Sequence, residues 1–296
     1  VLVYAKVERI SGKRDWIVDG GIGVGRVTKP GLSQKVGEAA INPVPRSMIC
    51  RALEEAADKY QYEGNLKVTI SVPDGEKIAS KTFNPRLGIK GGISILGTSG
   101  IVEPMSEKAL VDSIRVEMTQ HLAQGEKYLL VTPGNYGADY LRAHMDLPFE
   151  KNMKCSNYVG ETIDMAINMG AKGILFISHI GKFVKVAAGI MNTHSHNADA
   201  RMETLCAAAI RCGCTLECAR EVLDCNTTDE ALQVLDSNHI LKKTMEEIMR
   251  QIQFYLDHHS YHQILLGAVV FSNEYGYLGQ TADAGELINK ISKGEK

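Results

Sequence analysis

Long hydrophobic runs and an excess of one charge sign are both absent from this chain of 296 residues. The longest apolar stretches, Gly173 to Ile177 and Ile264 to Phe271, are far shorter than the roughly 18 residues that a membrane-spanning helix needs. Lys and Arg number 33 against 35 Asp and Glu, so the net charge of -2 does not favour nucleic acid or a membrane surface as a partner. Only a local cluster of cations can therefore bind an anionic ligand.

A leader segment is also not seen. No positively charged stretch followed by an apolar one opens the sequence, which predicts a cytoplasmic protein without a secretory signal. The chain begins at Val1 rather than at Met, and we expect that a front end is missing.

Paired cysteine motifs are absent, although the chain has seven Cys. An odd number of cysteines in a chain of this length indicates reduced thiols rather than a disulfide framework. Four of them lie between Cys206 and Cys218, but their spacing is not a paired CxxC array. His194 and His196 alternate rather than share a helical face, and His258 and His262, one turn apart, lack a third ligand. We therefore expect no metal site.

The sequence divides into two parts with different patterns, so two domains are predicted. Residues 1–125 are rich in Gly, Pro and short β-branched runs, which are typical of strands and tight turns in an α+β domain. Strands are predicted at Leu66–Val72 and Ile78–Thr82. A helix capped by Ser106 follows and ends at Gly125, where we expect the domain boundary. Its apolar face is Leu110, Ile114, Met118 and Leu122.

Residues 126–296 repeat a pattern of strand, glycine turn and helix. This alternation predicts a Rossmann-like α/β domain with a mainly parallel sheet, so the fold class is α/β, with an α+β arrangement overall because of the first domain. The predicted elements are the strands Tyr128–Val131, Ile174–Ile177 and Leu265–Phe271, a helix capped by Ser156, and a helical tract from Asp199 to Leu256 broken near Cys225 and Asn238.

A glycine-rich segment, Gly21 to Gly25, follows the predicted strand Trp16–Val18. Its spacing is G-x-G-x-G rather than G-x-G-x-x-G, and no helix follows, so it is not a dinucleotide-binding motif. Gly-rich backbone beside Arg26 and Lys29 suits a carboxylate ligand. A plain turn with solvated cations is the alternative.

Two proline-stiffened loops end in an arginine. They are Asn42-Pro43-Val44-Pro45-Arg46 and Asn84-Pro85-Arg86. A stiff loop lowers the entropy cost of holding a guanidinium against a carboxylate. Ordinary surface loops would look the same.

Turns at two strand ends in the second part are candidate ligand contacts. Pro133-Gly134-Asn135-Tyr136-Gly137 follows the first strand, where open parallel sheets bind ligands, although a structural turn would look similar. His179 and Lys182 follow the next strand, and His194 lies beyond. These side chains could supply a base or a cation.

Several long sequence motifs follow one another in a fixed order from about Gly20 to Arg201. In the first half they are GxGxVTKPGL at 23–32, GExAINPxPR at 37–46, KTFNPRLGI at 81–89 and GGISILGTSGIVEPMS at 91–106. In the second half they are PGN at 133–135, SN at 156–157 with Gly160, HIGK at 179–182 and AGIMNTHS at 188–195, followed by AD at 198–199 and Arg201. This order resembles the CbiD family of cobalamin biosynthesis. A TTGTC-like run and an acidic DDPD stretch, usual in that family, are not present, and we expect that residues are missing near Val1 to Arg14.

The resemblance implies that S-adenosylmethionine is the cosubstrate and that its methyl group goes to C1 of cobalt-precorrin-5B, a tetrapyrrole fringed by carboxylates. It implies a substrate site formed by Gly23, Gly25, Arg26, Lys29, Asn42, Arg46, Arg86, Lys90, Thr98 and Glu103. It implies cofactor contacts from Pro133, Gly134, Asn135, Gly137, Asn157, Gly160 and Gly181. The residues that would adjust charge during the reaction are His179, Lys182 and His194.

Two other classes of protein remain open at this stage. One is a nicotinamide-dependent reductase of the same pathway, which the irregular glycine spacing disfavours. The other is a non-catalytic protein that binds a corrinoid. The oligomeric state is not predicted.

Overall fold

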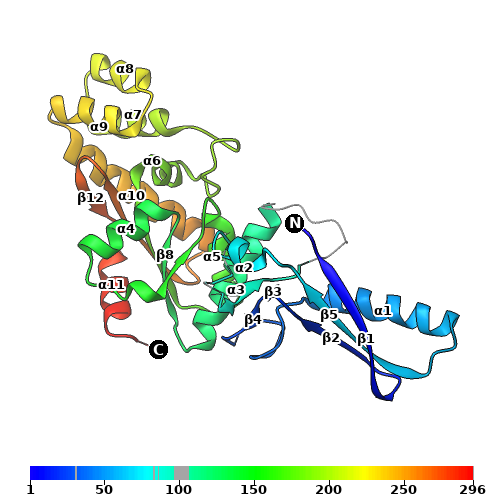
Figure 1. Cartoon of the computed structure of the whole chain (residues 1–296). Coiled ribbons are helices and arrows are strands. Elements are labelled where there is room, and N and C mark those ends of the chain that lie inside the picture. The colour runs from blue at the N-terminus through cyan, green and yellow to red at the C-terminus, as the bar shows by residue number, and fades with distance from the viewer. Residues whose placement is uncertain (31, 83, 86, 97–106, 296) are drawn as a thin grey trace. The chain divides into compact units, whose positions relative to one another are not determined.

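The computed structural model describes residues 1–30, 32–82, 84, 85, 87–96 and 107–295. The chain forms two compact units, Val1–Ala123 and Gln124–Lys296 (Figure 1). Both units contain helices and strands, so the predicted α/β class is confirmed. None of the helices described is long and apolar enough to cross a membrane.

The first unit is built on a three-stranded sheet with the strand order β1-β5-β2. The strands are β1 (Tyr4–Lys13), β2 (Trp16–Gly20) and β5 (Gly64–Ser71). β1 is antiparallel and β2 is parallel to β5. Helix α1 (Pro43–Lys59) contacts β2 and starts with a proline, whose fixed φ suits a first helical turn. The core of this unit is Val18, Val24, Ala39, Ile41, Leu53, Val68, Ile70 and Val72.

The first unit also contains two short two-stranded ribbons and a short helix. The ribbons pair β3 (Gly23–Val24) with β7 (Gly92–Ile93) and β4 (Arg26–Val27) with β6 (Ile89–Lys90). The predicted strand Ile78–Thr82 is wrong, because helix α2 (Gly75–Ala79) occupies part of it and turns follow. The buried residues Gly75 and Ala79 are four positions apart, which is the period of a helix.

Helix α3 (Glu107–Ala123) is the predicted helix before the boundary. Ile114 and Met118 on its predicted apolar face are buried, and Leu110 and Leu122 are partly buried. The predicted cap, Ser106, lies outside the described residues.

The second unit contains a five-stranded sheet in the order β12-β11-β10-β8-β9. The strands are β8 (Tyr128–Thr132), β9 (Asn152–Lys154), β10 (Gly173–His179), β11 (Leu265–Ser272) and β12 (Gly276–Gln280). β8, β9, β10 and β11 are mutually parallel and β12 is antiparallel to β11, so the predicted mainly parallel sheet is confirmed. β10 is buried along most of its length, as a central parallel strand should be.

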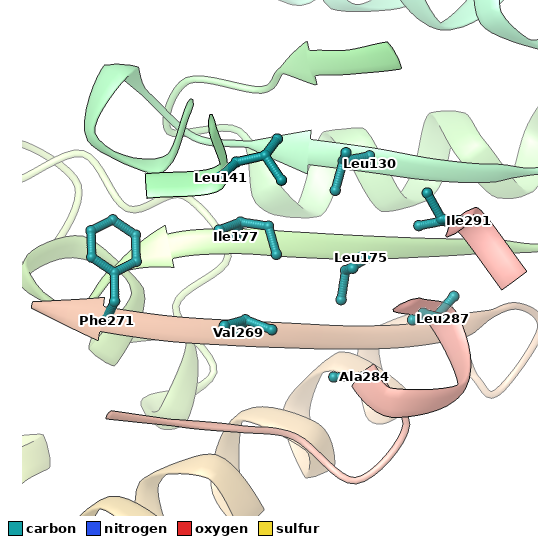
Figure 2. Packing of buried hydrophobic residues seen from close by; sticks show 9 residues of the cluster. All are labelled: Leu130, Leu141, Leu175, Ile177, Val269, Phe271, Ala284, Leu287 and Ile291. Carbon is teal, nitrogen blue, oxygen red and sulfur yellow. The ribbon is translucent and has the colours of Figure 1, made fainter. Parts of the chain in front are cut away.

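Helices α4 (Asn135–His144) and α11 (Ala284–Ser292) pack against side chains of the sheet. Figure 2 shows Leu141 of α4 and Leu287 of α11 directed toward alternate residues of β8, β10 and β11. This cluster is Leu130, Leu141, Leu175, Ile177, Val269, Phe271, Ala284, Leu287 and Ile291. Helices α5 (Val159–Asn168) and α10 (Leu241–Ser260) also contact the sheet.

The predicted helical tract consists of separate helices. Between Asp199 and Leu256 they are α7 (Arg201–Arg211), α8 (Leu216–Asp224), α9 (Thr228–Ser237) and α10. Two short helices precede this tract, α6 (Ile180–Phe183) and the 3-10 helix η2 (Val184–Ala188), and a further 3-10 helix, η1 (Phe149–Lys151), precedes β9. The breaks near Cys225 and Asn238 are confirmed, and a third break at Gly213, which has φ +87°, was not predicted. The predicted cap Ser156 is wrong, because Tyr158 precedes α5 and Ser156 lies in a left-handed turn.

Candidate functional site

The carboxyl ends of four parallel strands share one edge of the second unit's sheet. β8 ends at Thr132, β9 at Lys154, β10 at His179 and β11 at Ser272. β8 lies between β9 and β10, so the chain leaves β8 toward one side and later returns on the other. Open parallel sheets bind ligands in the crevice that such a reversal creates.

The turn after β8 contains the predicted cofactor contacts Pro133, Gly134, Asn135 and Gly137. Gly134 precedes α4 as its N-cap, and a Cβ built on it meets nothing within 4 Å, so its backbone is open to a ligand. The Asn135 side-chain oxygen accepts a hydrogen bond from the Lys154 ammonium at the end of β9. Gly137 is buried, and a Cβ there would collide with the carbonyl oxygen of Ile177. Gly137 therefore serves the close packing of α4 on β10.

His179 is held at the end of β10 by two backbone amides. Its Nδ1 accepts a hydrogen bond from the amide of Gly181 at 3.0 Å, so His179 is the N-cap of α6. The amide nitrogen of Asn273 lies 3.3 Å from its Nε2. Burial lowers the pKa of the imidazole, against the opposing effect of the Asp229 carboxylate. The ring is therefore neutral near pH 7, and its Nδ1 can accept the hydrogen bond from the Gly181 amide.

Lys182 and Asn157, which were predicted from different motifs, are paired. Lys182 Nζ donates a hydrogen bond to Asn157 Oδ1 at 2.8 Å, and Thr193 Oγ1 lies 3.5 Å from the same oxygen. The amide of Thr193 also donates to the Asn157 carbonyl oxygen at 2.9 Å. These contacts bring Lys182 and Asn157 together, and His194 follows directly on Thr193, which contacts Asn157.

Gly160 and His194 differ in their surroundings. A Cβ on the buried Gly160 would lie 2.9 Å from Cβ of Met191, and its amide donates to the Met191 carbonyl oxygen, so this glycine serves packing. His194 is exposed, and its Nδ1 accepts a hydrogen bond from the His196 amide at 3.1 Å. Among the contacts of the described residues, none joins His194 to His179.

Lys185 holds the loop that carries His194. Its side chain is 3% exposed, and its ammonium donates to the carbonyl oxygens of Ala198 at 2.6 Å and Thr193 at 3.3 Å. Asp199 lies 3.9 Å away. Burial lowers the pKa of this lysine. The buried Lys185 ammonium therefore holds the loop at both Thr193 and Ala198.

In the first unit, the predicted ligand contacts Gly23 and Gly25 are buried packing positions. Gly23 has φ +72°, and a Cβ there would collide with the carbonyl oxygen of Val72. A Cβ on Gly25 would collide with the side chain of Ile89. The glycine-rich segment thus lets backbone pack on backbone between β3, β7 and α2.

Three of the predicted cations are exposed and close in the fold of the first unit. Arg26 and Lys90 are directly opposite each other in the β4–β6 ribbon. The aliphatic part of Lys29 lies over Gly88, where a Cβ would be 2.6 Å from its Cγ. Arg26 is already paired with Asp19 at 2.8 Å and donates to the Gly20 carbonyl oxygen. Arg26, Lys29 and Lys90, hereafter the ribbon cations, remain accessible to an anion.

Arg46 and Asn42 make contacts within the first unit. The Arg46 guanidinium donates to three carbonyl oxygens, those of Ile41, Val18 and Ala39, at 3.1, 2.6 and 3.2 Å. The Asn42 side-chain oxygen accepts a hydrogen bond from Gln34 at 3.0 Å. Donors engaged in this way do not favour the predicted carboxylate clamp at Arg46. Arg86, Thr98 and Glu103 lie outside the described residues.

A cavity of about 540 Å³ at the end of β11 was not predicted from the sequence. It lies between α4 and the turn from Phe271 to Gly276, and Tyr136, Asp139 and Tyr140 of α4 line it. The spacing of Tyr136, Tyr140 and His144 by four residues was the available signal, because it places polar aromatic side chains on one helix face.

All seven cysteines are free thiols. Within the described part of the chain, no group of three or more His, Cys, Asp or Glu side chains is arranged to hold a metal ion.

Comparisons with known proteins agree with one family over most of the chain. A family model described as CbiD matches residues 1–104, and one described as CbiD, C-terminal domain, matches residues 192–282. The cobalt-precorrin-5B C(1)-methyltransferase of Ruminiclostridium cellulolyticum is 48% identical over 273 residues, which are 92% of this chain and 71% of the relative. The protein of the same name from Thermoanaerobacter sp. is 50% identical over 80% of this chain and 63% of its own length.

A solved structure is also similar in sequence. It is the cobalamin biosynthesis protein (cbiD) of Archaeoglobus fulgidus, which is 27% identical, with 68% of this chain and 60% of that chain covered and a TM-score of 0.28. The family models and the closely similar full-length relatives show that this chain belongs to the CbiD family.

Proposed function

We propose that this protein is an S-adenosylmethionine-dependent C-methyltransferase that converts cobalt-precorrin-5B to cobalt-precorrin-6A by methylation of C1, in cobalamin biosynthesis. The observation that carries this proposal is the 48% identity, over 92% of the chain, to a relative named cobalt-precorrin-5B C(1)-methyltransferase. The chain spans 71% of that relative, so the activity is assigned here to the residues that the two proteins share.

The strand-end edge of the second unit is the proposed seat of the methyl donor. When bound, S-adenosylmethionine supplies a methyl group bonded to a positively charged sulfur, and an electron-rich ring carbon can attack this methyl group. The open backbone at Gly134 and the polar side chains of Asn135 and Asn157 fit such a ligand, since they offer both donors and acceptors. Gly137, Gly160 and Gly181 support this edge through packing and capping.

The first unit is the proposed binding domain for the tetrapyrrole. The carboxylates around that macrocycle need fixed cations, and the ribbon cations Arg26, Lys29 and Lys90 are exposed on neighbouring backbone. Arg46 contributes by holding the backbone of this unit in place.

The chain's part in methyl transfer is mainly alignment. Displacement at a methyl group needs little covalent help from a protein, so holding carbon, methyl and sulfur in line supplies most of the rate gain. We assign charge adjustment on the macrocycle to Lys182, which Asn157 orients, and to His194, whose ring is exposed. His179 positions the strand-end edge, because its nitrogens face two backbone amides.

Free thiols at all seven cysteines agree with a reducing compartment, and we place the protein in the cytoplasm. Incubation of the purified chain with S-adenosylmethionine and cobalt-precorrin-5B tests the activity. A mass gain of one methyl group on the tetrapyrrole, with formation of S-adenosylhomocysteine, is the expected result. Binding of the tetrapyrrole without a change in its mass would identify a carrier, and oxidation of NADPH without methylation would identify a reductase.

A further inference from the structure

The cavity at the end of β11 has the size and position of a small-molecule site. Its volume of about 540 Å³ is within the range of ligand pockets, and all of its lining residues belong to the second unit. It opens at the carboxyl end of the sheet, because Phe271 lies at the end of β11 (Figure 2). None of the residues predicted to bind the cofactor lines this cavity, although Asn135 is adjacent to Tyr136 in α4.

One wall of the cavity is a set of aromatic rings. Tyr140 stacks on Phe271 with a centroid distance of 4.0 Å and an interplanar angle of 10°. His179 meets Phe271 edge-on at 5.5 Å, and Tyr136 lies 5.7 Å from His179. Tyr136 is 65% exposed, so part of its ring is free to contact a ligand. A flat heterocycle can stack on such a surface at low entropic cost, because the supporting rings are already fixed.

Two carboxylates line the cavity, beside tyrosine, histidine, serine and asparagine side chains. Asp139 and Glu274 line it, and within the described part of the chain neither carboxylate has an ion-pair partner. A ligand rich in carboxylate or phosphate groups would be repelled, which disfavours both the tetrapyrrole and a dinucleotide here. Carboxylates accept hydrogen bonds from sugar hydroxyl groups, and both carboxylates and aromatic faces attract a sulfonium cation.

The turn that forms the opposite wall is held in place before any ligand binds. Ser272 Oγ donates a hydrogen bond to Asp229 at 2.7 Å and accepts from the amides of Glu274 at 3.0 Å and Tyr275 at 3.1 Å. The Asn273 amide is fixed against His179. A rigid wall reduces the free-energy cost of ordering on binding.

We infer that this cavity binds the adenosyl half of the methyl donor, with the adenine ring on Tyr136 and the ribose hydroxyl groups near Asp139 and Glu274. This inference rests on the proposed function for the identity of the donor. In this arrangement the nucleoside lies on the β11 side of His179. The amino-acid half of the donor then extends toward Asn135, at the start of α4, and Lys154, at the end of β9.

Titration calorimetry with the whole chain tests this assignment without measuring turnover. The probes are S-adenosylhomocysteine and 5′-methylthioadenosine, which share the adenosyl group and differ in the amino-acid half. Tyr136→Ala is expected to weaken both affinities by about tenfold or more, because base stacking on an aromatic ring is lost. Tyr136→Phe should retain them. Tyr261→Ala is the matched control, because Tyr261 is 79% exposed and lies outside the cavity.

The outcomes separate this assignment from the proposed function. Equal weakening of both probes by Tyr136→Ala, with Tyr261→Ala unchanged, supports the adenosyl site. Unchanged affinities in Tyr136→Ala, in a protein that still methylates cobalt-precorrin-5B, overturn the site and leave the function standing. Tyr136-dependent binding of both probes without any methyl transfer supports the site and removes the function. A wild-type chain that binds neither probe contradicts both.

Discussion

The amide of Gly181 donates a hydrogen bond to Nδ1 of His179 at 3.0 Å, so a histidine caps the helix that follows the central strand of the second unit. A second amide, that of Asn273, faces the other ring nitrogen. A histidine in this position links the ends of β10 and β11, and its protonation would remove the acceptor that the Gly181 amide uses.

His179→Asn tests the consequence of that cap for stability. Burial lowers the folded-state pKa of His179 below its unfolded value of about 6.5, so the unfolded chain binds more protons as the pH falls. Its contribution to stability is therefore complete above about pH 6.5 and is lost as the pH falls toward the folded pKa. Asparagine can still accept from the Gly181 amide but does not titrate. The free energy of unfolding, measured with urea between about pH 7 and pH 5, should fall less steeply for the variant. Parallel curves would mean that His179 does not titrate with unfolding.

Gly23→Ala should destabilise the first unit severely. The new Cβ would collide with the Val72 carbonyl oxygen at a backbone φ of +72°, so strain and overpacking together should cost about 3 kcal/mol or more. Gly37→Ala is the matched control, since Gly37 also has a positive φ of +93° but has open space around it. The control should lose only about 1 kcal/mol in denaturant unfolding. Equal losses in the two variants would show that the close backbone packing at Gly23 is not important.

Lys185→Met should loosen the loop that carries His194. The carbonyl oxygens of Thr193 and Ala198 would lose their charged donor, at a cost of about 1 to 3 kcal/mol. Limited proteolysis should then cut within residues 192–199 faster than in the wild type. Lys172→Met removes an exposed lysine and should leave both stability and cleavage nearly unchanged. A Lys185 variant that resists the protease as well as wild type would contradict this role.

His194→Ala separates chemistry from donor binding. His194 is exposed and follows Thr193, which contacts Asn157, so its loss should lower the rate of methyl transfer by about tenfold or more, as expected for a general acid or base. The affinity for S-adenosylhomocysteine should not change. Turnover assays and calorimetry on the same preparation check both statements, and unchanged turnover would remove His194 from the mechanism.

Three strands of the second unit could be predicted because their hydrophobic patterns are strong, whereas β9, β12 and α11 were not predicted. The runs around Leu130, Leu175 and Val269 are continuous and bounded by glycine or polar turns, and all three form parallel strands. The elements of the first unit were harder to predict, since the strands of its ribbons are two residues long and depend on glycine contacts between distant segments. A strand was predicted at Ile78–Thr82, after the turn at residues 72–75, but helix α2 occupies Gly75–Ala79 in the fold.

The candidate site residues were predicted only where a motif contains them. Asn157 and Lys182 were predicted from separate sequence motifs, and only the fold shows that they are hydrogen-bonded to each other. Arg46 had the pattern of an anion clamp, but three carbonyl oxygens surround it, and their positions depend on long-range packing. The cavity beside Tyr136 depends on the approach of α4 to the end of β11, which local sequence does not encode.

Photochemical labelling with S-adenosylmethionine carrying a radioactive methyl group tests the central claim most directly, namely that the strand-end edge of the second unit holds the methyl donor. Irradiation of the complex should attach the label within residues 133–144 or 271–276, and an excess of S-adenosylhomocysteine should suppress it. Label found only within residues 1–123 would contradict the account.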